Sequence, residues 1–528
     1  MSAVLDHIVP SMSSSVSSLN SPLEQSNGNG VDWVVQKFGG TSVGKFPIKI
    51  ARDVVKRYRD DGNRIVIVVS ARSTGTKAEG TTNRLLAAIK EAQIRYSTKY
   101  VEIVNEILED HISAADQYVS NEELRNELKI MFREECEYVS RVLGAAQILE
   151  EVSPKTKDMV VGVGEKLSCL FMTAVLKDQG VDARAITLEK IVPSRFKEGR
   201  GLDHAFYKAM SETMAQVVLD GPENQVSVVT GFFGPVPGSL LSQVGRGYTD
   251  LCAALFAIGL QASELQVWKE VDGIFTADPR KVPTARLLAT ITPEEAAELT
   301  YYGSEVIHPF FTNLVSQARV PIRIKNVENP AGEGTVILSD NLDGSVKRGV
   351  NSPYRTPRAV QGKTLYARAI ENAGKDRSPT AVTAKDHIVI VNVHSNRRSL
   401  SHGFYATLFG ILDRYRVIVD LISTSEVHVS MAVHSDNGEA ELRTALDELQ
   451  ALGTVEVLSN MIILSLVGKQ MKNMVGIAAK MFTTLASNNV NIEMISQGAS
   501  EINISCVIDS KDMIKALNVI HHTLIPPK

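Results

Sequence analysis

The sequence predicts an α/β protein in which a mostly parallel β-sheet is covered by helices on both faces, followed by two small modules of strands and helices. Three observations support this prediction. Apolar strand patterns alternate with helical patterns through about residue 325, the composition changes over residues 341 to 380, and two similar segments then follow with an offset of 73 residues.

The composition indicates a soluble globular protein without a nucleic-acid or membrane partner. Of its 528 residues, 44% are hydrophobic and 22% are charged, and the formal net charge is -4, so no excess of positive charge attracts nucleic acid or anionic lipid. Apolar runs such as residues 65 to 69 fall short of the roughly 20 residues that cross a bilayer. The four cysteines are widely scattered, which favours a reduced, cytoplasmic setting.

Residues 1 to 30 are predicted to be a disordered tail, because they are rich in Ser, Asn and Gly and contain no Lys or Arg. They lack the apolar core of a signal peptide and the arginine-rich pattern of a mitochondrial presequence.

The elements of the sheet and its helices follow from local patterns. The buried strand patterns, each followed by a glycine or polar turn, lie at residues 33–38, at 65–70, at the start of 158–186 and at 225–234. Helices are expected from Pro47, from Leu85 and through residues 100 to 150. Ligands of such folds bind at the carboxyl ends of the strands, which is where these turns lie.

The two C-terminal modules have the strand-helix-strand-strand-helix-strand order of a ferredoxin-like fold. Aligning them pairs Gly403 with Gly476, Phe409 with Phe482, Leu412 with Leu485 and Asp420 with Glu493. The edges of two such sheets are available to pair side by side or across a dimer, so we expect a homo-oligomer. The preceding residues, 341–384, are interpreted as a linker or surface insertion because they are rich in Pro, Gly, Arg and Lys.

A glycine-rich stretch, KFGGTSVGKF, follows the first predicted strand. Gly39, Gly44 and Lys45 have the spacing of a nucleoside-triphosphate loop, but Phe46 stands where that loop has its metal-binding hydroxyl. Lys37, at the strand end, would reach phosphate oxygens while the amides of the turn surround them. The alternative is a structural turn between a strand and a helix, and this motif alone leaves both interpretations open.

Two further glycine motifs also have a structural and a functional interpretation. In VGVGEKLSC, Leu167 takes the third glycine position of a dinucleotide fingerprint, which disfavours that fold. Glu165, at the expected helix start, is either a helix N-terminal charge or a carboxylate for a substrate ammonium. In QVGRGYTDL, Arg246 has a fork that matches a carboxylate, or Thr249 or Asp250 simply caps a helix.

The segment WKEVDGIFTADPRKV leads from a strand that ends at Lys269 and Glu270 into a turn with Asp278 and Arg280. This turn either grips a nucleotide or is only a hairpin.

The segment YYGSEVIHPF contains Glu305 and His308, and a lone histidine is more often structural than catalytic. H-E-x-x-H, G-x-S-x-G and paired cysteine ligands do not occur, so zinc hydrolysis and elbow-serine chemistry have little support.

Together, KFGGTSV, VGVGEKLS, GRGYTD, DGIFTADPR and YYGSEVIHP, in this order and ahead of two repeats, closely resemble the aspartate kinases of the amino acid kinase family. The resemblance covers about residues 33 to 528 and is strongest for the single-function fungal type. It implies a three-layer αβα sandwich of the amino acid kinase type over residues 31–340, the linker at 341–384, and two ACT domains at 385–458 and 459–528.

The reaction implied by this resemblance transfers the γ-phosphoryl group of ATP to the β-carboxylate of L-aspartate, giving 4-phospho-L-aspartate in the first step of threonine and methionine biosynthesis. A carboxylate with a solution pKa of about 4 is already ionised, so no general base is needed. The obstacle is repulsion between two anions, and the expected catalysts are positioning, positive charge, and Mg²⁺ bound mainly through the ATP phosphates.

By the same resemblance, Lys37 and Asp250 are catalytic. Lys37 would neutralise the transferring phosphoryl group, and Asp250 would orient Lys37 or its neighbours. Glu165 would bind the ammonium of aspartate, and Arg246 its α-carboxylate. The substrate set is Thr82, Glu165, Arg246, Gly247, Thr249 and His308. The ATP set is Lys37, Phe38, Gly39, Gly40, Thr41, Ser42, Lys45, Lys269, Glu270, Phe275, Asp278 and Arg280. No residue is expected to hold a metal directly.

The sequence departs from the common bacterial pattern at three places. Gly247-Tyr248-Thr249-Asp250 replaces Gly-Gly-Ser-Asp, Lys269-Glu270 replaces Thr-Asp, and Glu305 replaces a frequent lysine. Lys45 or His308 would then take over part of the ATP contacts.

The first repeat, again by resemblance, has the matching effector pocket, with L-threonine favoured over lysine as the inhibitor. Its residues are Ser401, Gly403, Phe404, Tyr405, Val419, Asp420, Ser425 and Glu426. Two alternatives remain: another amino acid kinase, acting on glutamate, acetylglutamate or a nucleotide, and an inactive amino-acid sensor. Arg246 and the two repeats argue against the first alternative, and the intact set of charged site residues argues against the second.

Overall fold

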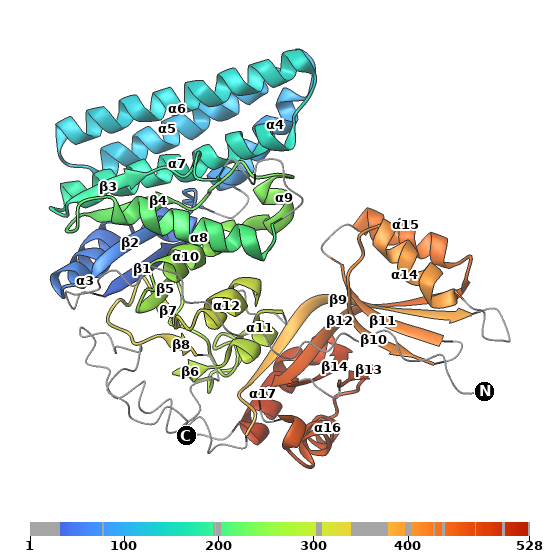
Figure 1. Cartoon of the computed structure of the whole chain (residues 1–528). Coiled ribbons are helices and arrows are strands. Elements are labelled where there is room, and N and C mark those ends of the chain that lie inside the picture. The colour runs from blue at the N-terminus through green and yellow to red at the C-terminus, as the bar shows by residue number, and fades with distance from the viewer. Residues whose placement is uncertain are drawn as a thin grey trace, which may run out of the picture.

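The computed structural model describes residues 32–75, 79–193, 196, 202–301, 309–338, 378–395, 403–425, 428–435, 439–469, 471–498 and 502–525. These residues form an α/β part through strand β8 and a C-terminal part built on a second sheet (Figure 1). The predicted tail at 1–30 and most of the predicted linker at 341–384 lie outside the described residues.

The α/β part is built on an eight-stranded sheet in the order β3-β4-β2-β1-β5-β7-β8-β6. Neighbouring strands are parallel, except that β7 and β8 are antiparallel. Runs such as IVIVV in β2 are buried on both faces, as parallel strands require. The strands are β1 (Trp33–Phe38), β2 (Arg64–Val69), β3 (Ala183–Ile186), β4 (Val226–Thr230), β5 (Glu264–Lys269), β6 (Thr290–Ile291), β7 (Ile322–Asn326) and β8 (Thr335–Ile337).

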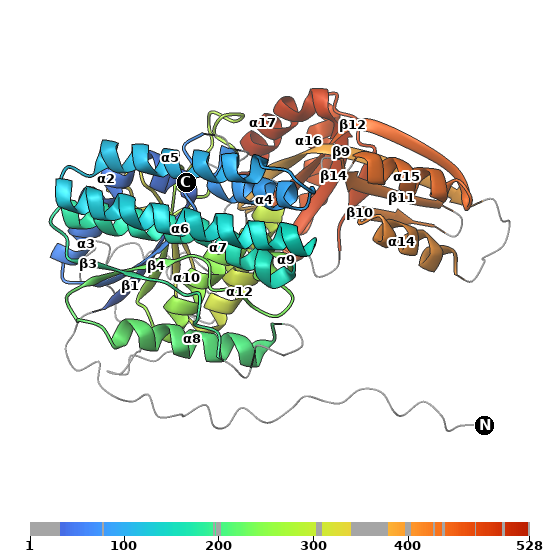
Figure 2. The same ribbon diagram turned by 90° about the horizontal axis from the view of Figure 1, so that it is seen from above.

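Helices cover both faces of this sheet, as predicted (Figures 1 and 2). One face packs against α7 (Pro154–Asp178) and a continuous helical segment made of α2 (Pro47–Lys49), the π-helix η1 (Ile50–Lys56) and α3 (Arg57–Asp60). The opposite face packs against α10 (Tyr248–Gly259), with α8 (His204–Leu219) and α12 (Pro309–Gln317) beside it. An outer layer, α4 (Thr81–Ala92), α5 (Lys99–Tyr118) and α6 (Glu122–Leu149), lies over α7. The shorter helices are α1 (Gly40–Lys45), α9 (Leu240–Val244) and α11 (Pro293–Tyr301).

The strand predicted at the start of residues 158–186 is wrong, because this segment belongs to the single helix α7. Ser153 caps the helix by accepting a hydrogen bond from the Thr156 amide, and Pro154 occupies the first turn. The helix is apolar nearly all round since it is buried on most sides, so its periodicity does not distinguish it from a buried strand. Glu165 consequently lies in the middle of a helix and not at its start.

Helix α7 is also the one helix among the described residues that is long and apolar enough to cross a membrane. Most of that stretch is buried inside the folded chain, as expected for a core helix.

The C-terminal part is one antiparallel sheet in the order β10-β11-β9-β12-β14-β13. Its strands are β9 (Ala381–Ser395), β10 (Val419–Thr424), β11 (His428–His434), β12 (Gly453–Val467), β13 (Met494–Ser496) and β14 (Asn503–Asp509), and its helices are α14 (Phe404–Arg414), α15 (Glu439–Leu449), α16 (Ile477–Ser487) and α17 (Met513–Leu524). The predicted repeat is confirmed, because α14 and α16 follow Gly403 and Gly476, whose φ values are 95° and 82°. Glycine adopts this left-handed conformation without strain.

The two modules share strands, which the sequence did not predict. The 15-residue strands β9 and β12 pair along almost their whole length, so residues 381–385 of β9 lie beside residues 463–467 of β12, in the second module. These residues supply the strand that was expected after α17. The last four residues of the predicted linker, 381–384, are therefore strand, and their apolar side chains Ala381 and Val382 are buried.

Candidate active site

Lys37 and Asp250 form an ion pair at the carboxyl ends of the strands. Lys37 lies near the end of β1 and Asp250 in the first turn of α10, and the Lys37 Nζ and Asp250 Oδ1 atoms are 2.8 Å apart. Their side chains are only 11% and 20% exposed, so the pair holds the ammonium in a defined position. This contact is the one expected if Asp250 orients Lys37.

The GTSVGK stretch forms the short helix α1, in which Gly40 and Gly44 share one face. A Cβ on Gly40 would lie 2.0 Å from the carbonyl oxygen of Ala71, and one on Gly44 would lie 2.1 Å from that of Ser73. Only glycine allows α1 to approach this backbone so closely. Close packing therefore explains why Gly44 precedes Lys45 at the spacing of a triphosphate loop.

Ser42 links α1 to the end of β5. Its Oγ donates a 2.6 Å hydrogen bond to Oε1 of Glu270, the residue that follows Lys269. Two predicted ATP contacts are thus brought together.

Glu165 is a buried carboxylate with one oxygen in use. Its Oε1 accepts hydrogen bonds from the hydroxyl of Tyr248 at 2.7 Å and from the amide of Ala71 at 3.3 Å. Its Oε2 is buried and has no hydrogen-bond partner within the described part of the chain. Burial raises the pKa of Glu165 to about 7, although these hydrogen bonds act in the opposite direction. Such a carboxyl group is suited to receive an ammonium group.

The other predicted substrate residues lie around the start of α10 and α4. Thr249 Oγ1 accepts a 3.0 Å hydrogen bond from Ser70, which follows β2. Arg246 and Gly247 belong to the 3-10 turn that precedes α10, and Thr82 is the second residue of α4. His308 and Glu305 lie outside the described residues.

A cavity of about 210 Å³ lies beyond the carboxyl ends of β5 and β7, where ligands of parallel sheets bind. Of the predicted ATP set, Phe275 lines it. Asp272, which also lines it, accepts hydrogen bonds from the side-chain amides of Asn326 at 3.1 Å and Asn329 at 3.2 Å.

Asp278 and Arg280 do not line this cavity. The guanidinium of Arg280 donates to both oxygens of Asp278, at 3.0 and 2.9 Å, and its side chain is 88% exposed. The flanking residues Ala277 and Val282 are buried in a core shared with α16 and α17. These contacts favour the interpretation of this segment as a structural turn against the C-terminal part.

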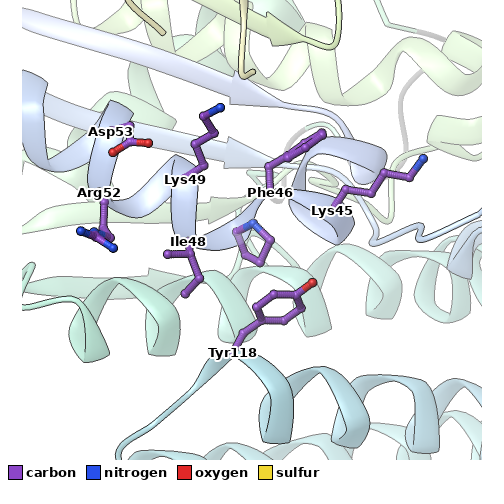
Figure 3. Close-up of a pocket in the computed structure, with 8 residues that line it drawn as sticks. Lys45, Phe46, Ile48, Lys49, Arg52, Asp53 and Tyr118 are labelled. Carbon is purple, nitrogen blue, oxygen red and sulfur yellow. The ribbon is translucent and has the colours of Figure 1, made fainter. Parts of the chain in front are cut away.

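A second cavity, of about 320 Å³, lies between the α1–η1 segment and the end of α5 (Figure 3). The side chains of Lys45, Lys49 and Arg52 at its rim extend in different directions and do not converge (Figure 3). The ammonium of Lys49 donates to the carbonyl of Glu328 at 2.7 Å. This cavity therefore lacks the converging positive charges of a phosphate site. Lys37 does not line it, so the cavity does not support an ATP site shared by Lys45 and Lys37.

The predicted effector residues lie on α14 and β10 or directly beside them, except that Ser401 and Glu426 are outside the described residues. The hydroxyl of Tyr405 donates to the carbonyl of Ser425 at 2.7 Å. Asp420, whose side chain is 1% exposed, pairs with Lys385 of β9 at 2.7 Å. Gly403, Phe404 and Val419 lie at the beginnings of these two elements.

Ser70, Ala71 and Tyr248 contact predicted site residues but were not predicted themselves. Ser70 had a usable signal, because it is the first polar residue after a buried strand. The contact between Tyr248 and Glu165 depends on the meeting of α10 with α7, and no local pattern shows it.

Among the described residues, no group of three or more His, Cys, Asp or Glu side chains is placed to hold a metal ion. One oxygen of Asp250 contacts Lys37, and one oxygen of Glu270 accepts the hydrogen bond from Ser42.

Comparison with known proteins agrees with this geometry. Residues 32–326 match the amino acid kinase family and residues 464–524 match an ACT domain. The aspartokinase of Schizosaccharomyces pombe is 55% identical over 496 residues, which are 94% of this chain and 93% of that protein.

Two solved structures of E. coli aspartokinase III are each 25% identical to the chain. The complex with aspartate and ADP has a TM-score of 0.65 and covers 94% of this chain and all of its own. The complex with lysine and aspartate has a TM-score of 0.71 and covers 93% of this chain and 99% of its own. The chain therefore belongs to the amino acid kinase family and, within it, to the aspartokinases.

Proposed function

We propose that the chain transfers the γ-phosphoryl group of ATP to the β-carboxylate of L-aspartate, giving 4-phospho-L-aspartate and ADP. The observation that supports this most directly is that two charged groups suited to the reaction lie at the same edge of the sheet. One is an ammonium fixed by an ion pair, Lys37 with Asp250, and the other is a buried carboxyl group with an unused oxygen, Glu165. The E. coli relative solved with aspartate and ADP supports the choice of substrates.

Aspartate would be held through its α-amino and α-carboxylate groups. The unused Oε2 of Glu165 would accept the ammonium, and Arg246 would pair with the α-carboxylate in a bidentate manner. Thr82, Thr249 and His308 complete the proposed set. The β-carboxylate is then left to face the nucleotide.

The chemical step needs charge stabilisation and no proton transfer. An oxygen of the ionised β-carboxylate forms a bond to the γ-phosphorus while the bond to the β,γ-bridging oxygen breaks, and ADP leaves with that electron pair. Lys37, held in place by Asp250, offsets the negative charge on the transferring group. The nucleotide would extend from α1 and Lys269 toward the cavity lined by Phe275.

Mg²⁺ would arrive with ATP and be held mainly by its phosphates. It would supply positive charge that reduces the repulsion between the two anions, beside the ammonium of Lys37.

Regulation by L-threonine through the first ACT-like module, a homo-oligomeric state and a cytoplasmic location complete the proposal. The E. coli relative solved with lysine supports an amino-acid effector in this family. The four cysteines are free and buried, in keeping with a reducing compartment.

The test is a hydroxamate assay with purified protein, L-aspartate, ATP, Mg²⁺ and hydroxylamine, run with and without L-threonine. We expect aspartyl hydroxamate, and inhibition by threonine. No hydroxamate from aspartate, with hydroxamate from glutamate or acetylglutamate, or with ADP released when a nucleotide is the acceptor, would assign another amino acid kinase. Thermal stabilisation by threonine without any ATP turnover would indicate an inactive sensor.

A further inference from the structure

Arg72 is a buried arginine that lies outside the predicted site. It belongs to the loop between β2 and α4 and is 2% exposed. Its guanidinium contacts Asp110 of α5 twice, at 2.8 Å from the carboxylate and at 2.6 Å from the backbone carbonyl. It also lies over the ring of Phe171 in α7, at 6.0 Å. Burying a guanidinium is costly unless it is paired, so these contacts tie the loop firmly to the outer helical layer.

The backbone on either side of Arg72 contacts residues assigned to aspartate. The amide of Ala71 donates to Glu165, and the hydroxyl of Ser70 donates to Thr249. The carbonyl of Arg72 accepts from both the hydroxyl of Thr81, at 2.8 Å, and its amide, at 3.2 Å. Thr82 follows Thr81 directly in the chain. The pairing of Arg72 with Asp110 therefore fixes the backbone both at the start of the loop, after β2, and at its end, before Thr82.

Asp110 has a second cation, which makes a matched comparison possible. Arg84 of α4 contacts the other carboxylate oxygen at 2.7 Å. The neighbouring His111 is buried, and burial lowers its pKa to about 4, so it is neutral near pH 7. Removing either arginine therefore leaves Asp110 paired with the other.

We propose that Arg72 is a positioning residue for aspartate, which acts through Asp110 to fix the backbone that presents the Ala71 amide and Thr82. This inference rests on the proposed assignment of Glu165 and Thr82 to aspartate. Misplacing a binding group by about 1 Å costs up to about a hundredfold in rate. The loop also packs against α1 of the proposed ATP set, through the carbonyls of Ala71 and Ser73. Lys37 and Ser42 keep their own partners, Asp250 and Glu270, outside the loop, so the larger loss falls on aspartate binding and the smaller one on ATP binding.

The experiment compares Arg72→Met with Arg84→Met in the full-length protein. Each variant removes one cation from Asp110, but only the first releases the loop. We expect Arg72→Met to raise the aspartate KM by about tenfold or more and the ATP KM by about threefold at most, and Arg84→Met to leave both values within about twofold. Direct titration with aspartate should show the same loss.

Three results would overturn the inference: wild-type aspartate KM in Arg72→Met, an equal loss in Arg84→Met, or an equal rise in the ATP KM. If Arg72→Met does not fold, Arg72→Lys decides, because lysine keeps the charge but not the planar guanidinium, whose Nη2 atom makes both contacts with Asp110. An aspartate KM raised about threefold or more is expected for it, and a wild-type value would refute the proposal. A wild type that neither binds nor phosphorylates aspartate would refute the proposed function itself, and this inference with it.

Discussion

Lowering the pH from 8 to 6 should weaken aspartate binding by about tenfold, because it protonates Glu165. Burial raises the pKa of this carboxyl group to about 7 in the free protein. If only the ionised form accepts the substrate ammonium, the apparent Kd is multiplied by 1 + 10^(7−pH). The factor is about 11 at pH 6 and about 1.1 at pH 8.

Calorimetric titration with aspartate in the absence of ATP measures this directly, since the phosphates of ATP cannot then contribute. The β-carboxylate of aspartate, with a pKa of about 4, stays ionised throughout. Binding at pH 7 should release about half a proton, seen as a dependence of the heat on the buffer. Glu165→Gln is the control, and we expect it to bind weakly with little dependence on pH. A wild-type Kd that is the same at pH 6 and pH 8 would refute the reasoning, as would an unchanged pH dependence in Glu165→Gln.

The same shift acts on stability with the opposite sign. A carboxyl group whose pKa is raised in the folded state favours folding in its protonated form. The contribution of Glu165 to the free energy of unfolding is therefore fully present below about pH 4.5 and is lost as the pH rises to about 7. The ionised form of Glu165, which binds the substrate ammonium, is thus the form that favours folding less.

Three further predictions concern the chemistry, the regulation and the packing of α1. Lys37→Ala should lower kcat far more than it raises the aspartate KM, whereas Arg246→Ala should mainly raise that KM; steady-state kinetics giving the reverse pattern would contradict the assigned roles. Asp420→Asn, which removes the partner charge of Lys385, should reduce inhibition by threonine, while Glu493→Gln at the equivalent position of the second repeat should not; the opposite result would place the effector in the second module. Gly44→Ala should lower the melting temperature and destabilise the protein by about 1–3 kcal/mol, because its Cβ would meet the Ser73 carbonyl. The control Gly410→Ala, which has open space around it in α14, should be neutral or stabilising by up to about 1 kcal/mol. Equal shifts of the melting temperature in the two variants would show that α1 can move away from Ser73.

Local patterns were sufficient wherever an element is determined by its own residues. The strand at 33–38, the helix that begins at Pro47, and the matching glycines before α14 and α16 all follow from short-range chemistry, namely apolar runs, a fixed proline φ and a left-handed glycine. The family followed from five motifs in order, and Lys37, Glu165 and Asp250 do lie in the paired or buried positions that such a site needs.

The tertiary structure decided what depends on residues far apart in the sequence. Helix α7 is apolar all round because several elements surround it, so its own sequence did not distinguish it from a strand. The start of strand β9 precedes the first module in sequence but completes the sheet of the second module. It does so by pairing with β12, about 80 residues further along the chain. The contact of Tyr248 with Glu165 and the anchoring of Arg72 by Asp110 join segments that only the packed fold brings together. Sequence thus determined the elements and the chemical groups of this protein, and long-range packing determined the charge state, partner and position of each group.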